Sequence, residues 1–186
     1  MNMEYKFDGA GESKAGNFTS TKVGPKFKAV FPEVENMIRM QASNRPMLYK
    51  DKFFNEQGIV YADQSFFDLF SFKWIEGDQK KALSEPNAIV FTQSSAKRYF
   101  GNDNPVGKMV KVGSDSGLYK VTGVIADCPS NSQIKFNFLA SFSTLHAEED
   151  TYWDANYTTY LLLKNPSDIK TLQAKLPAFM SKEMKG

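Results

Sequence analysis

The sequence has one cysteine and one histidine among its 186 residues. Cys128 alone cannot form an intrachain disulfide bond or supply the several thiolates of a cysteine-based zinc site. Its immediate neighbours, Asp127 and Pro129, bring no positive charge that would lower the pKa of the thiol. We therefore interpret Cys128 as a packing or incidental residue, and it leaves the redox compartment of the protein open.

An excess of one charge sign and long hydrophobic runs are also missing. The chain has 23 Lys and Arg against 21 Asp and Glu, so it lacks the strongly basic balance of proteins that bind nucleic acid or anionic membranes. Its apolar runs, such as residues 88–91 and 160–163, are far shorter than the ~20 residues of a membrane-spanning helix. The first residues lack the pattern of a secretory signal. We therefore expect either a cytoplasmic protein or a piece excised from a longer one.

The sequence does contain enough apolar material for a sizeable core, with 41% hydrophobic and 14% aromatic residues. The length suits one domain or two closely associated subdomains. Apolar spacing predicts a β-rich middle between two ends of β/α character. The predicted helices cover residues 24–31, 66–70, 93–100 and a segment after Ser167, and the predicted strands cover residues 34–40, 47–49, 59–62, 88–91, 108–112, 118–125, 136–142 and 157–163.

Some of these elements carry sharper expectations. Thr92 is placed to cap the helix over residues 93–100 with its hydroxyl, and Gly101 to end that helix. The strand over residues 157–163 alternates poorly between apolar and polar residues, so we expect it to be well buried. The final helix should present one apolar face and be kinked or weakened at Pro177. That face consists of Ile169, Leu172, Leu176 and Phe179.

The densest apolar feature is a run of five aromatic residues, Phe66, Phe67, Phe70, Phe72 and Trp74. Clusters of this kind usually belong to the core, and we interpret this one in that way. The alternative is an exposed patch that meets a partner.

Residues 11–16 have the glycine spacing of a phosphate-binding loop, with Gly11 and Gly16 at its ends. The loop requires a lysine and a hydroxyl directly afterwards, because the lysine neutralises the phosphates. Asn17 and Phe18 stand there instead. We therefore expect a flexible leader and no nucleotide site.

His146 is the remaining candidate for chemistry. On a helix over residues 143–150 it would lie near Glu149 and Asp150, but a specific transition-metal site normally has three or four ligands. A Ser-His-Asp triad is formally possible, yet no nucleophile-elbow sequence accompanies the histidine. We interpret this stretch as a solvated polar helix face. The sequence therefore predicts no catalytic, cofactor-binding or metal-binding residue, and the chain is expected not to be an enzyme.

A series of short motifs follows the chain in order from residue 31 to residue 164. It includes Phe-Pro-Glu-Val-Glu at residues 31–35 and Tyr-Ala-Asp-Gln-Ser-Phe-Phe-Asp-Leu-Phe at residues 61–70, followed by residues 77–78, 86–87, 89–90, 96–97, 100–101, 105–108, 121–125, 138–142 and 160–164, with Leu83, Asp127, Pro129 and Trp153 between them. Together these motifs resemble the extracytoplasmic domain of MacB-type and FtsX-like ABC-transporter permeases. The detail is most similar to the permeases of Bacteroidetes-type bacteria.

This resemblance implies an α+β fold, a MacB-like periplasmic core domain with two subdomains. A porter-like α/β layer would come from about residues 1–71 plus 146–186, and a β-rich, sabre-like insertion from about residues 72–145. The family pattern also leads us to expect a further strand after the final helix. Without that strand, the porter-like layer would have an exposed sheet edge.

The resemblance also implies a function. The chain would be the non-catalytic periplasmic domain of a permease subunit, on the periplasmic side of the bacterial inner membrane. It would transmit ATP-driven motion of the transmembrane helices to a substrate or a periplasmic adaptor during export or efflux. The implied partners are the protein's own transmembrane helices, a cytoplasmic ATPase, a second permease subunit in a homodimer or heterodimer, and an adaptor protein. Neither a cofactor nor nucleic acid is expected, and the excised domain should be a monomer.

Two other readings of the sequence stay open. A stand-alone periplasmic module that binds a ligand or protein would need a well-formed apolar pocket with convergent polar groups. A hydrolase would need a serine close to His146.

Overall fold

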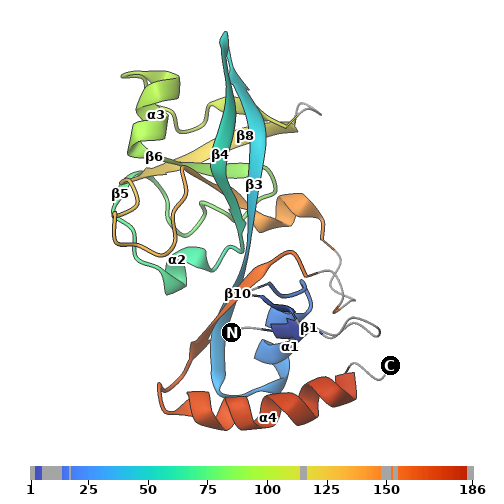
Figure 1. Cartoon of the computed structure of the whole chain (residues 1–186). Coiled ribbons are helices and arrows are strands. Elements are labelled where there is room, and N and C mark those ends of the chain that lie inside the picture. Colours follow the sequence, from blue (N-terminus) through green and yellow to red (C-terminus); the bar gives the residue numbers. More distant parts are fainter. Residues whose placement is uncertain are drawn as a thin grey trace. The chain divides into compact units, whose positions relative to one another are not determined.

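The computed structural model describes residues 3–5, 14–16, 18–113, 117–147, 152 and 155–183. Over this part of the chain the fold is α+β, as expected (Figure 1). The helices are α1 (Val23–Val30), α2 (Phe66–Leu69), α3 (Gln93–Phe100) and α4 (Asp168–Glu183), with a 3-10 turn η1 (Phe142–Leu145). The strands are β1 (Met3–Tyr5), β2 (Lys14–Gly16), β3 (Val34–Tyr49), β4 (Lys52–Ala62), β5 (Trp74–Gly77), β6 (Ala88–Thr92), β7 (Met109–Val112), β8 (Gly117–Ile125), β9 (Phe138–Ser141) and β10 (Thr158–Leu163).

The chain divides into two compact units. Unit 1 combines both ends of the chain, Met1–Arg39 and Ala147–Gly186, and unit 2 is the continuous stretch Met40–His146. The division falls within β3. The names porter-like and sabre-like for two subdomains stay predictions. No helix in the described part of the chain is both long and apolar enough to cross a membrane.

Unit 1 has a core between α1, α4 and the neighbouring strands β3 and β10. Phe27 and Phe31 lie one helical turn apart, and their rings meet each other and Phe179 of α4 edge to face at 4.9–5.6 Å. Leu172 is buried and Leu176 is partly buried, whereas Ile169 is 50% exposed, so the apolar face of α4 is only partly covered. Pro177 lies within α4 and does not end it.

Unit 2 is built on strands that pair in the order β3-β4-β9-β6-β8, with β5 at the outer edge of β8. Because β7 pairs with both β8 and β3, these strands form a closed path of hydrogen-bonded neighbours. Tyr61 of β4 and Tyr119 of β8 are both buried, and their hydroxyl groups hydrogen-bond at 3.0 Å. Two pairs in the path, β4 with β9 and β6 with β8, are parallel.

The strands predicted over residues 34–40 and 47–49 form one continuous strand, β3, which makes a long hairpin with β4 (Figure 1). Proline normally interrupts a strand because it has no N–H to donate. The carbonyl of Pro46 accepts the N–H of Gly113 at 2.8 Å, on the side where β7 pairs. In a strand the N–H and C=O of one residue point to the same side, so Pro46 removes no bond to β4.

The expectations for the strand over residues 157–163 and for the helix over residues 143–150 are wrong. The strand over residues 157–163 was expected to be well buried, but β10 is half-buried or exposed along its length because it is the end strand of its sheet. The helix expected over residues 143–150 stops as a 3-10 turn at Leu145, where His146 takes a left-handed conformation with φ of 47°. Residues 148–150 lie outside the described part of the chain.

The aromatic cluster belongs to the core, as predicted. Phe66 and Phe67 are buried, and the ring of Phe66 contacts those of Phe67, Phe70 and Phe72. Trp74 meets Phe67 at 4.8 Å between ring centroids.

Candidate functional site

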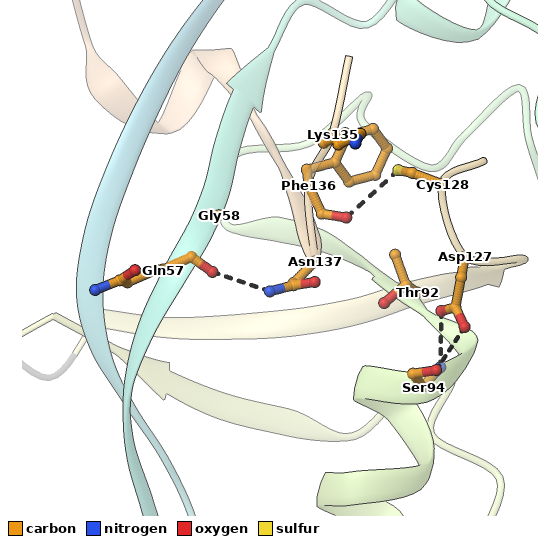
Figure 2. Close-up of a pocket in the computed structure, with 9 residues that line it drawn as sticks. All are labelled: Gln57, Gly58, Thr92, Ser94, Asp127, Cys128, Lys135, Phe136 and Asn137. Atoms are coloured by element: carbon orange, nitrogen blue, oxygen red, sulfur yellow. Dashed lines mark hydrogen bonds between the residues drawn. The ribbon is translucent and has the colours of Figure 1, made fainter. Parts of the chain in front are cut away.

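A polar cavity of about 460 Å³ lies in unit 2 beside the first turn of α3 (Figure 2). Because β6 and β8 are parallel, Thr92 at the end of β6 and Asp127 just after β8 come to the same edge of the sheet. In sheets with parallel strands this is the edge at which ligands usually bind. The cavity is lined by Gln57, Gly58, Thr92, Ser94, Asp127, Cys128, Lys135, Phe136 and Asn137.

The N-terminus of α3 is capped by Asp127 and not by Thr92, so the cap expected from the sequence is wrong. One carboxylate oxygen of Asp127 accepts the N–H of Ser94 at 3.0 Å, and the other accepts its hydroxyl at 2.5 Å (Figure 2). The hydroxyl of Thr92 instead donates to Ser95 at 3.0 Å. A helix N-terminus attracts anions, and here the carboxylate of Asp127 already occupies that position.

The hydrogen bonds also set the charge of Asp127. Partial burial alone would raise the pKa of this carboxyl, but the hydrogen bonds from the hydroxyl and the N–H of Ser94 bring its pKa below the usual value. Asp127 is therefore ionised at neutral pH. A bound phosphate or carboxylate at this helix end would face a negative charge already in place.

Cys128 is half-buried, and its Sγ donates to the carbonyl of Phe136 at 3.4 Å. Burial raises the pKa of the thiol. A protonated thiol is a poor nucleophile and a poor metal ligand. This is consistent with the interpretation of Cys128 as a packing residue.

Backbone and amide groups at the cavity hold neighbouring strands together. Asn137 donates its side-chain amide to the carbonyl of Gln57 at 3.1 Å and its backbone N–H to Gly58 at 2.8 Å. Its own carbonyl accepts the N–H of Thr92 at 3.0 Å. Most polar groups that line the cavity are thus bonded to one another. They do not converge on the cavity as the alternative of a small-ligand module requires.

A second cavity, of about 510 Å³, is a more apolar groove in unit 1 between β10 and α4. β10 is the last strand in its sheet order, and none of the other described strands pairs with its second edge. At the start of β10 that edge is met by Thr19, which exchanges two backbone hydrogen bonds with Tyr157. The groove is lined by Thr159, Tyr160, Leu161, Leu163, Ile169, Leu172, Gln173 and Leu176.

The structure does not bring His146 together with catalytic or metal-binding partners from the described residues. His146 is exposed, and no described serine hydroxyl or carboxylate is hydrogen-bonded to its imidazole. Glu149 and Asp150 lie outside the described residues, and so do residues 11–13 and 17 of the loop with phosphate-like glycine spacing. Within the described ranges, no group of three or more His, Cys, Asp and Glu could hold a metal ion.

A buried charged cluster was missed in the sequence. The carboxylate of Glu56 is only 4% exposed and accepts hydrogen bonds from Arg98 and from the hydroxyl of Tyr99, each at 2.6 Å. Burial and the nearby carboxylate raise the pKa of Tyr99, so its hydroxyl keeps its proton. The guanidinium group of Arg98 also lies over the rings of Phe54 and Tyr99. This cluster joins α3 to β4, and no local sequence signal marks it.

Comparison with known proteins identifies the fold. The family described as MacB-like periplasmic core domain matches residues 6–179. No curated protein matches the chain. A domain assigned to a permease protein of Porphyromonas gingivalis has a TM-score of 0.79 and 22% sequence identity, and the match covers 92% of this chain and 73% of that chain.

Two further solved structures share the fold at 16% identity. The periplasmic region of MacB from Actinobacillus actinomycetemcomitans has a TM-score of 0.65, with 86% of this chain and 71% of that chain covered. The extracellular domain of the noncanonic ABC-type transporter YknZ from Gram-positive bacteria has a TM-score of 0.62, with 83% and 78% covered.

Proposed function

Because this chain belongs to the family of MacB-like periplasmic core domains, we propose that it transmits ATP-driven movement of transmembrane helices to a substrate or a periplasmic adaptor during export. As a member of this family it is the periplasmic domain of an ABC-transporter permease. What we propose beyond membership of the family is that the domain transmits movement and that it engages an adaptor.

The supporting observation is that both ends of the chain fold into the same unit. Unit 1 contains Met1–Arg39 and Ala147–Gly186, and unit 2 is inserted between them as one continuous stretch. Membrane segments that flank the domain on either side would therefore both connect to unit 1. Movement of those segments would enter the domain through unit 1 and reach unit 2 through the chain.

Contacts within unit 1 suit it to receive such a force. The last turn of α4 is fixed by Glu183, which pairs with Lys26 of α1 at 3.2 Å and accepts the hydroxyl of Tyr152 at 3.1 Å. Earlier in α4, Lys175 pairs with Glu33 just before β3. A displacement of the end of α4 is thereby applied to α1 and to the start of β3 as well.

The proposal is tested by measuring distances in the assembled transporter. In a cysteine-free full-length permease with its ATPase, spin labels are placed at Lys170 in unit 1 and Lys97 in unit 2, two exposed positions. The distance distribution should change between ATP-bound and nucleotide-free states. A control pair at Lys97 and Asn131, both in unit 2, should not change. An ATPase that binds but does not hydrolyse ATP separates binding from turnover.

The same distribution in every nucleotide state would contradict the proposal. So would unchanged export after deletion of the domain from a permease that still inserts and still hydrolyses ATP. The permease is expected to form a homodimer or heterodimer through its membrane part. The excised domain is expected to be a monomer, which light scattering would check.

A further inference from the structure

One face of the β3–β4 hairpin and the adjoining strands in unit 2 is apolar and uncovered. Leu48 of β3 lies opposite Phe53 of β4 and opposite Lys111 of β7, and Lys111 lies opposite Leu118 of β8. Residues opposite one another in paired strands point to the same side of the sheet. The next row on the same face is Met109 opposite Lys120. These six residues are called the hairpin face below.

The alternate residues of the same strands point to the other side and are buried. Met47, Val110, Val112 and Tyr119 are at most 6% exposed. The hairpin face is the reverse: Phe53 is 61%, Leu118 50% and Met109 45% exposed, and no other large apolar side chain described is as exposed as Phe53. Isolated exposed apolar residues are ordinary. Three in two adjacent rows form a patch of the kind that marks an interaction site.

The charge on this face has one sign. Lys111 and Lys120 are exposed, and neither has an ion-pair partner among the described residues. None of the six residues of the hairpin face carries a carboxylate. The aliphatic stem of Lys111 lies between Leu48 and Leu118 in the strand row, so its ammonium group stands above an apolar surface. The surface is complementary to apolar side chains accompanied by carboxylates.

We propose that the hairpin face is the docking surface for a periplasmic protein segment that presents apolar side chains flanked by Asp or Glu. This rests on the proposed function, because it names the surface and the chemistry through which the domain engages a protein partner. Phe53 and Leu118 are the apolar anchors, and Lys111 and Lys120 select the partner by charge.

Two other occupants fit this face less well. A second copy placed face to face would bring four lysines into one interface with no carboxylate of the hairpin face to pair with them, and like charges at an interface are unfavourable. An anionic membrane would attract the lysines, but each contributes only about 1 kcal/mol near such a surface. A short row of partly exposed side chains gives little insertion in addition.

The test is photo-crosslinking in cells that make the full-length permease, its ATPase and the other proteins of its transport system. Benzoylphenylalanine replaces Phe53 or Leu118, and a control replaces Lys97, an exposed residue of α3 in the same unit. Both test positions should give an adduct with the same periplasmic protein, and Lys97 should not. Mass spectrometry of the adduct should place the crosslink beside Asp or Glu residues.

Charge variants then test the stated chemistry. Replacing both lysines, Lys111→Glu with Lys120→Glu, should lower the crosslinking yield roughly tenfold, because like charges would then face each other. Lys111→Arg with Lys120→Arg should keep the yield, and changing the partner's carboxylates to lysine should restore it for the Glu variant. Both lysines are exposed, so circular dichroism of each variant should show an unchanged fold.

Several results would overturn the inference. One is an adduct with lipid or with a second permease copy, or no adduct at all. Another is a crosslinking yield at Lys97 equal to that at Phe53 and Leu118. A third is a crosslinking yield that does not change when Lys111 and Lys120 are replaced with Glu. Binding of the excised domain to vesicles of phosphatidylglycerol and phosphatidylethanolamine would also count against it. The spin-label test is independent of this one. Nucleotide-dependent movement without crosslinking would reject the docking surface but not the transmission of movement. Crosslinking without movement would reject the transmission of movement but not the docking surface.

Discussion

Asp127 caps helix α3 although it lies 33 residues beyond Ser94, whose N–H and hydroxyl its carboxylate accepts. The contact joins the end of β8 to the start of the helix that follows β6. It therefore closes the edge of the sheet at which the polar cavity lies, and it places a fixed negative charge there.

Replacing Asp127 with alanine should destabilise unit 2 by about 1 kcal/mol at neutral pH, as the loss of a helix cap usually does. The pKa of Asp127 is lowered in the folded protein. A lowered pKa gives stability that is present above the ordinary pKa of an aspartate and is lost as the pH falls through the lowered value. The difference between wild type and Asp127→Ala should therefore shrink in acid. Urea denaturation of the excised domain across this pH range would measure it.

The matched control is Asp127→Asn, which keeps an acceptor oxygen but no charge. Because neither Asn nor Ala ionises, the difference in unfolding free energy between Asp127→Asn and Asp127→Ala should not change with pH through the titration of residue 127. A wild-type advantage over Asp127→Ala that stays constant into strong acid would contradict the assignment of the cap.

This cap shows where the sequence stops being informative. The helix itself was predictable, because its apolar spacing and Gly101, with φ of 66°, define it locally. The hairpin of β7 and β8 was predictable for the same reason. The capping residue was not, since Asp127 reaches Ser94 only when β6 and β8 lie parallel, and that arrangement depends on the whole sheet.

Burial at sheet edges was also beyond the sequence. The apolar run in β10 reads like a buried strand, but the number of strands beside it decides its exposure. For function, the motif series pointed to the correct family without locating any surface. The hairpin face depends on which residues of β3, β4, β7 and β8 lie opposite one another, and this register is set by tertiary pairing.

Gly123 of β8 lies directly under the ring of Trp74. A Cβ at Gly123 would come within 2.4 Å of the Trp74 ring and 3.1 Å of the carbonyl of Glu76. Gly123→Ala should therefore displace Trp74 and destabilise unit 2 by roughly 1–3 kcal/mol, the usual cost of overpacking. In a Trp153→Phe background the fluorescence of Trp74 should shift toward that of an indole in water.

The control for this prediction is Gly101→Ala. An added Cβ there meets nothing within 4 Å, but the positive φ is strained for alanine. It should destabilise the protein by roughly 1–3 kcal/mol, the usual cost of a sparsely populated backbone conformation, without changing the Trp74 spectrum. A spectrum that stays the same in Gly123→Ala would mean that the ring does not pack on this glycine.

The buried carboxylate of Glu56 should make Tyr99 costly to replace. Tyr99→Phe removes a hydrogen bond to a charged group, which contributes about 2 kcal/mol. Tyr152→Phe is the comparison. The hydroxyl of Tyr152 donates to the more exposed Glu183 over a longer distance of 3.1 Å, so removing it should lower the free energy of unfolding by less. Denaturation of Tyr99→Phe, of Glu56→Gln and of the double variant would complete a double-mutant cycle for this pair, with Tyr152→Phe measured beside it. Equal losses for both tyrosines would contradict the role given to burial.

Hydrogen exchange should reveal the open edge of β10 as an alternation along the strand. Lys164 donates its N–H to Glu33 beside β3, and Tyr157 exchanges bonds with Thr19 at the other edge. Since successive N–H groups in a strand point to opposite sides, those of Tyr160 and Leu162 face β3, and those of Leu161 and Leu163 face the groove under α4.

In the excised domain the amides of Leu161 and Leu163 should therefore exchange roughly fivefold faster than that of Leu162, because a backbone hydrogen bond contributes about 1 kcal/mol. The groove beside them has the apolar lining that a further strand would cover. If a strand of the full-length permease occupies this edge, Leu161 and Leu163 should become protected there while Leu162 stays unchanged. Equal protection of all three amides in the excised domain would show that the edge is already paired.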